Sequence, residues 1–80
     1  MKGDYSLLDM VRHELYKANI RAHLNGDQWN DSGFKWKLVV GDTLSVSIVD
    51  NKYFISKMDE VVYIAHSVLS CADEIVWRIS

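Results

Sequence analysis

Two stretches of alternating apolar and polar residues, joined by Gly41 and Asp42, dominate the middle of this 80-residue chain. A period of two is typical of strands that bury one face and expose the other. The pattern therefore predicts an antiparallel hairpin at the centre of the molecule. Its predicted inward positions are Phe34, Trp36, Leu38 and Val40 in the first strand, and Leu44, Val46 and Ile48 in the second.

A third strand is predicted to follow a second tight turn at Asp50 and Asn51, which are residue types that favour such turns. Tyr53 and Ile55 have the same alternation as the preceding strand. They are therefore predicted to continue the buried face of the sheet.

The first 20 residues have the three-four spacing of a helix with one buried stripe. Asp4 or Ser6 can cap its first turn. Asn19 is predicted to end the helix in a left-handed conformation, with the apolar Ile20 after it. The stripe consists of Leu8, Val11, Leu15 and Ala18.

Residues 20–33 allow fewer firm predictions. Alternation over residues 20–24 favours a short strand, but Ala22 also fits the helical stripe, so both interpretations stay open. Residues 25–33 are predicted to form a loop, because they are rich in Asn, Asp and Gly. Trp29 lies in this predicted loop. It could plug the open end of the core or anchor a partner.

A second helix is predicted to begin at Ser56, with Asp59 three residues later as a capping residue. Its buried stripe would consist of Met58, Val61, Val62, Ala65, Val68, Leu69 and Ala72. A last alternating run then predicts a strand with Ile75, Trp77 and Ile79 inward, and Val76 and Arg78 outward.

These elements predict an α+β fold in the order α-(β)-β-β-β-α-β, in one domain that spans residues 1–80. Two helices would pack on one face of a sheet of four or five strands, mainly antiparallel. The last strand, reached through a helix, would lie parallel to its neighbour.

The sheet face turned away from the helices is the predicted working surface. It would carry cations and no carboxylates, with Phe54 in a thin apolar strip. One interpretation is an ordinary solvated face. The other is a docking face for a protein with an acidic surface. The predicted partner-binding residues are Trp29, Lys35, Lys37, Lys52, Phe54 and Arg78.

The sequence predicts no catalytic, cofactor or metal site. The three histidines lack metal-ligand spacing, and Cys71 is the single cysteine. Known phosphate-binding and nucleophile motifs are absent. We therefore do not expect an enzyme. A single cysteine and the lack of a signal peptide or a membrane span predict a cytoplasmic protein, of the producing cell or of a host cell.

The predicted order of a helix, three antiparallel strands and a helix resembles double-stranded-RNA-binding domains. Those domains bind RNA through a basic cluster at the start of the second helix. Here that place reads Ser56, Lys57, Met58, Asp59 and Glu60, and the acidic residues would repel phosphate. The RNA-binding function is therefore not expected.

In size and style the chain also resembles small phage and mobile-element proteins, including anti-CRISPR and other anti-defence inhibitors. This resemblance implies a non-enzymatic inhibitor or regulator that occludes a surface of a host protein complex. Two alternatives stay open. One is weak nucleic-acid binding through the exposed sheet face, and the other is a structural subunit of a homo-oligomer such as a homodimer.

Overall fold

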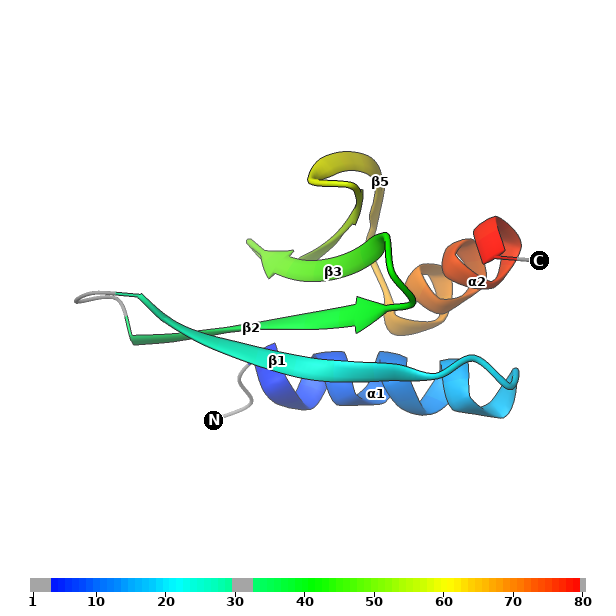
Figure 1. Cartoon of the computed structure of the whole chain (residues 1–80), viewed down its shortest axis with the longest axis horizontal. Helices are drawn as coiled ribbons and strands as arrows, with labels where there is room; N and C mark the ends of the chain where they lie inside the picture. Colours follow the sequence, from blue (N-terminus) through cyan, green and yellow to red (C-terminus); the bar gives the residue numbers. More distant parts are fainter. Residues whose placement is uncertain (1–3, 30–32, 80) are drawn as a thin grey trace.

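The computed structural model describes residues 4–29 and 33–79. In this part of the chain, two helices and five strands occur in the order α-β-β-β-β-β-α, and the strands form one antiparallel sheet in sequence order (Figure 1). The elements are α1 (Asp4–Lys17), β1 (Ala22–Trp29), β2 (Gly33–Val40), β3 (Leu44–Val49), β4 (Lys52–Lys57), β5 (Glu60–Ala65) and α2 (Val68–Ile79).

Both helices pack on the same face of the sheet, because their buried side chains share one core with the inward rows of the strands. The helices contribute Leu8, Val11, Leu15, Cys71, Ala72 and Ile75. The strands contribute Leu38, Val40, Leu44, Val46, Ile48, Tyr53, Ile55 and Ala65. The predicted two-layer α+β fold is confirmed, and so are the predicted inward positions in β2, β3 and β4 whose side chains are described. Trp36 packs partly buried against this core, and the side chain of Phe34 lies outside the described residues.

The end of α1 matches its prediction. Asn19 has a φ of 64°, and its N–H donates to the carbonyl of Tyr16. The N–H of Ile20 donates to the carbonyl of Leu15 over 2.9 Å. This pair of bonds is the Schellman arrangement, which satisfies the last carbonyls of a helix. Ala18, which was predicted in the buried stripe, is exposed.

The strand interpretation of residues 22–24 is confirmed, but the predicted loop is wrong for residues 25–29 and 33. β1 continues to Trp29, which pairs with Gly33 of β2. Gly26 does not break the strand, because it leaves room for the ring of Trp36 opposite it. A Cβ at Gly26 would lie 2.8 Å from that ring. Tyr5 of α1 also contacts this ring, edge-on at 4.8 Å between centroids. Residues 30–32 of the predicted loop lie outside the described residues.

The predictions for residues 56–79 assign the wrong types of secondary structure to these positions. The region predicted as the second helix contains β5, and the predicted last strand is the second half of α2. As a result no strand lies parallel to another among the described residues. Five residues predicted to be buried are exposed instead, and Val76, predicted outward, packs against the core. The five are Met58, Val61, Leu69, Trp77 and Ile79.

α2 begins where Ser67 caps it. The N–H of Ser70 donates to the Ser67 hydroxyl over 3.1 Å, and the N–H of Cys71 donates to the Ser67 carbonyl. Such a serine satisfies N–H groups that have no partner inside the helix. The buried stripe from Val68 through Cys71, Ala72 and Ile75 follows the three-four spacing. α2 is therefore a regular amphipathic helix with a recognisable start.

The β4–β5 hairpin turns on Met58 and Asp59, which both have positive φ angles, of 52° and 68°. Asp50 and Asn51 at the β3–β4 turn have the same conformation. Two consecutive left-handed residues fit the twist of a two-residue hairpin, and Asn or Asp tolerates them better than Met. The Met58 N–H also donates to the Thr43 carbonyl over 3.0 Å, which ties this turn to the β2–β3 turn.

Replacing Met58 by Asn is expected to raise the free energy of unfolding by about 0.5–1 kcal/mol, because Asn relieves the left-handed strain. Little packing is lost, since the Met58 side chain is 75% exposed. Urea unfolding followed by circular dichroism measures the change. The matched control is Met10→Asn at an exposed position of α1, which should lower stability slightly because Asn is a poorer helix former. Equal effects at the two positions would contradict the strain argument.

Candidate functional site

The open face is the side of the sheet turned away from both helices. Its residues follow from the strand register and from alternation along each strand. Those with described side chains are His23, Asn25, Lys37, Val39, Ser45, Ser47, Val49, Lys52, Phe54, Ser56, Val61 and Ile64. None of them is fully buried, so this face is available for contact.

An apolar strip crosses the open face. Phe54 in β4 pairs with Ile64 in β5, and their side chains lie next to each other. In the next row Ser45 and Ser56 separate Val39 from Val61, so the strip is continuous only across β4 and β5. Ile64 is 41% exposed and Val61 is 50% exposed. The strip is wider than the sequence predicted, because β5 adds these two side chains.

Two of the predicted cations flank this strip. Lys37 pairs with Asn25, and Lys52 pairs with Val49 at the other end of the sheet. Both lysines are exposed, and neither has an ion-pair partner among the described residues. The predicted placement of Lys37, Lys52 and Phe54 on the open face is confirmed. Their role in binding stays a prediction.

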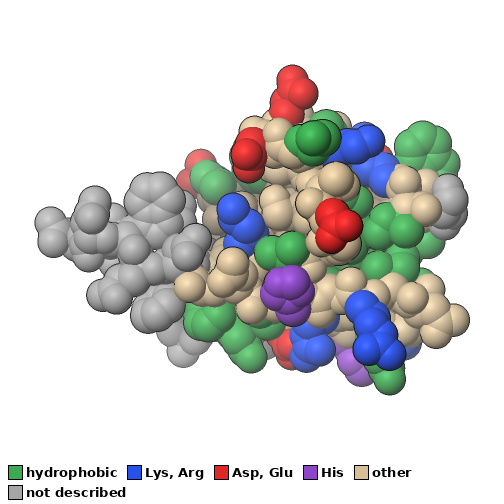
Figure 2. Space-filling view, viewed as in Figure 1, with side chains coloured by type: hydrophobic (Ala, Val, Ile, Leu, Met, Phe, Trp, Pro, Cys, Tyr) green, Lys and Arg blue, Asp and Glu red, His purple; other side chains and the backbone are tan. Residues whose placement is uncertain are grey.

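A shallow groove of about 490 Å³ lies at the Lys37 end of the open face. Val39 and the exposed Met58 give it an apolar wall. Asp42 and Asp59 line it as well, so two carboxylates share this groove with Lys37, which the sequence did not predict. Figure 2 likewise shows basic, acidic and apolar side chains interspersed on the side turned to the viewer, without one continuous basic surface. This mixture suits a protein partner better than a polyanion.

The prediction that Arg78 lies on the open face is wrong, because α2 replaces the predicted last strand. It belongs to the helix layer, where its Nε lies 2.8 Å from Glu74 Oε2. This contact is an ion pair and not a hydrogen bond, because the N–H is not directed at that oxygen. Arg78 Nη2 donates to the carbonyl of Val62 over 3.4 Å. Val62 is the extra residue at an irregularity in the β4–β5 pairing.

Two further predicted residues are placed only by their backbone. Trp29 is the last residue of β1, and Lys35 in β2 pairs with Asp27. The side chains of Trp29 and Lys35 lie outside the described residues. The two predicted roles of Trp29, a plug of the core or an anchor for a partner, therefore both stay predictions.

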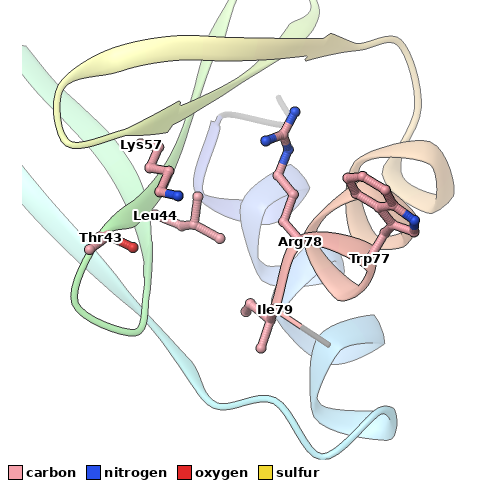
Figure 3. A pocket seen from close by; sticks show the side chains of 6 residues that line it. All are labelled: Thr43, Leu44, Lys57, Trp77, Arg78 and Ile79. Carbon is pink, nitrogen blue, oxygen red and sulfur yellow. The ribbon is translucent and has the colours of Figure 1, made fainter.

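A second surface, which the sequence did not predict, lies beside α2. We call it the α2 groove. It has a volume of about 590 Å³ and lies between the ends of β3 and β4 and the last turn of α2 (Figure 3). Its lining residues are Thr43, Leu44, Lys57, Trp77, Arg78 and Ile79. Trp77 is exposed and not inward as the alternation predicts, because residues 68–79 form a helix and not a strand.

Among the described residues, Cys71 is a titratable group that lies fully buried in the core. Burial raises the pKa of its thiol to about 12, because a thiolate would lose its hydration in the core. Burial also raises the pKa of Tyr53, with a smaller contribution from the charge of Cys71. A thiol of this kind stays protonated near neutral pH and is a poor nucleophile.

Among residues 4–29 and 33–79, groups of three or more His, Cys, Asp or Glu side chains that could hold a metal ion do not occur. Within these residues, neither helix is long and apolar enough to cross a membrane.

Comparison with known proteins adds no relative. No protein-family model matches the chain, and neither a curated protein nor a solved structure matches it.

Proposed function

We propose that this chain is a small non-enzymatic binding protein that occupies a surface of a protein partner with its open face. The apolar strip around Phe54 and Ile64 carries this proposal. Folded proteins usually bury such a pair, and an uncovered apolar patch flanked by polar residues marks a contact surface. Here the helix layer covers only the opposite face of the sheet.

The chemistry of the open face indicates the kind of partner. Lys37 and Lys52 lie beside the strip, and both are exposed. A partner with an apolar centre and acidic residues around it would match this arrangement. The apolar contact would supply most of the affinity, and the lysines would mainly raise the association rate.

The most concrete form of the proposal is an inhibitor or regulator, encoded by a phage or another mobile element, that occludes a surface of a host protein complex. Occlusion needs only a stable contact face, which a domain of this size can present. A cytoplasm is the proposed compartment, because the single cysteine is an unpaired thiol in the core.

The substitution Phe54→Ser tests the open face. Serine already occupies neighbouring positions of this face, so the sheet should tolerate it. We expect binding to the partner to weaken about tenfold or more, because the centre of the apolar strip is lost. The partner is captured from the host lysate with the unchanged protein and identified by mass spectrometry. Its affinity is then measured by isothermal titration calorimetry.

The matched control is Tyr16→Ser, which removes an exposed aromatic side chain from α1 in the helix layer. It should leave the affinity unchanged. Equal affinities for Phe54→Ser and the unchanged protein would overturn the proposal. A captured nucleic acid, or a homo-oligomer in light scattering that Phe54→Ser dissociates, would also overturn it in favour of one of the two alternatives.

A further inference from the structure

The α2 groove combines apolar walls with positive charge. Leu44, Trp77 and Ile79 provide the apolar part, and Lys57 and Arg78 provide the cations. Figure 3 shows Lys57 and Arg78 on opposite sides of the groove, with the side chain of Leu44 between them. The groove lies in the helix layer, on the other side of the sheet from the open face.

Trp77 is the most unusual residue of this surface, because 74% of it is exposed. Large aromatic side chains are highly buried on average. Trp77 and Arg78 also line an adjacent hollow of about 760 Å³ together with Tyr63, so they form a ridge between two depressions. Tryptophan, tyrosine and arginine are the residue types that contribute most to binding at protein interfaces. An apolar side chain from a partner would cover the exposed ring.

Arg78 and Lys57 differ in whether other residues hold their charged groups in place. The ion pair with Glu74 and the bond to the Val62 carbonyl hold the guanidinium of Arg78 in place. Lys57 is exposed and has no ion-pair partner among the described residues. The walls beside Lys57 are fixed by the hydrogen bond between the Met58 N–H and the Thr43 carbonyl. Lys57 thus offers its ammonium group to a ligand at the edge of the groove, with Glu60 as its cross-strand neighbour.

Carboxylates are absent from the described residues that line the α2 groove. Glu60 lies across from Lys57 in the β4–β5 pairing and Glu74 pairs with Arg78, but neither lines the groove, so a bound carboxylate would have Lys57 as its nearest charged lining residue outside an ion pair. A nucleic acid fits less well, because its binding needs several cations along the backbone and here only Lys57 is unpaired.

We infer that the α2 groove binds a short acidic segment of a protein partner. A carboxylate side chain of the segment would pair with Lys57, and one neighbouring apolar side chain would lie against Trp77 while another would lie against Ile79. This contact is separate from the open face. The protein would therefore have two binding surfaces, one on each side of the sheet.

An NMR titration tests this inference. The probe is an acetylated and amidated tetrapeptide of sequence Asp-Leu-Asp-Leu, and the control peptide is Asn-Leu-Asn-Leu. With the acidic peptide we expect saturable chemical-shift changes of the Trp77 indole N–H and of the Thr43 and Lys57 amides. The expected Kd is about 1 mM. The neutral peptide should bind about two- to fivefold more weakly, which corresponds to one exposed ion pair.

Variants assign the binding to the groove. Lys57→Gln should weaken binding of the acidic peptide about two- to fivefold. Trp77→Ala should weaken it about tenfold or more. Lys52→Gln is the matched control on the open face and should change nothing. Shifts that are absent up to about 10 mM peptide, equal for both peptides or located on the open face would overturn the inference. Phe54→Ser should not affect this titration, so its result does not depend on the function proposed for the open face.

Discussion

Replacing Ile75 by Ala is expected to lower the free energy of unfolding by about 2–5 kcal/mol. Trp77→Ala, only two residues along α2, is expected to change it by less than about 0.5 kcal/mol. Ile75 has no exposed surface and packs in the core between the helices and the sheet. The Trp77 side chain lies mostly in solvent, so its removal leaves no cavity. Urea unfolding followed by far-ultraviolet circular dichroism measures both changes.

This pair of variants also distinguishes the two interpretations of the last residues. In a strand, Ile75 and Trp77 would point to the same side and both substitutions would be costly. Similar losses of stability would therefore contradict α2. Because an 80-residue domain has little stability to spare, Ile75→Ala could prevent folding altogether. Ile75→Val, with an expected loss of about 0.5–1.5 kcal/mol, keeps the comparison measurable.

A second large effect is expected at alkaline pH. The Cys71 thiol has a pKa of about 12 in the folded protein, against an ordinary value of 9.0. Between these two values the unfolded chain loses the thiol proton and the folded chain keeps it. Stability contributed by the protonated thiol is therefore complete below pH 9 and falls as the pH rises. The slope is about 1.4 kcal/mol per pH unit, or about 4 kcal/mol across the whole window.

Unfolding in urea at a series of pH values from about 8 to about 11 measures this slope. The control is Cys71→Ala, which removes the titrating group and leaves a small cavity. We expect this variant to be less stable at neutral pH and to lose much less stability on alkalinisation. The raised pKa of Tyr53 acts in the same direction and should leave a residual slope. If the variant and the unchanged protein have the same slope, burial of the Cys71 thiol does not control alkaline stability.

The central sheet could be predicted from sequence because its signal is local and repeated. In β3, for example, each inward residue such as Val46 alternates with an outward one such as Ser45. Turn residues with a left-handed preference, such as Asn51, separate the strands. The end of α1 was predictable for the same reason, since Asn19 combines a suitable side chain with an apolar residue after it.

The last third of the chain could not be predicted in this way. The apolar residues from Val61 to Ala72 fit a helical period, and so do those from Val68 to Val76, so spacing alone does not choose between two registers. Pairing with β4 decides the matter, because a strand at residues 60–65 completes the ladder of β4. The turn at Met58 and Asp59 was difficult to predict from the sequence, since Met is not typical of left-handed positions.

In the candidate site, too, some residues were predictable from the sequence and others were not. Lys37 and Phe54 were placed correctly because they belong to alternating strands. Arg78 was placed on the wrong layer because its assignment depended on the last element. Because of the same error, the sequence did not predict that Val61 and Ile64 extend the apolar strip. It also did not predict that the ring of Trp77 is exposed. The positions of Val61 and Ile64 depend on the pairing of β5 with β4, and the exposure of Trp77 depends on the packing of α2, which the spacing within one segment does not contain.

The packing of α1 against α2 has a consequence for biosynthesis. Leu8 and Leu15 belong to the same core as Ile75, yet the ribosome makes all five strands between them. Until α2 emerges, the inner side of the meander lacks part of its cover and the nascent chain carries uncovered hydrophobic surface. We therefore expect translation that stalls before residue 68 to yield a product that engages chaperones or proteases rather than a functional fragment.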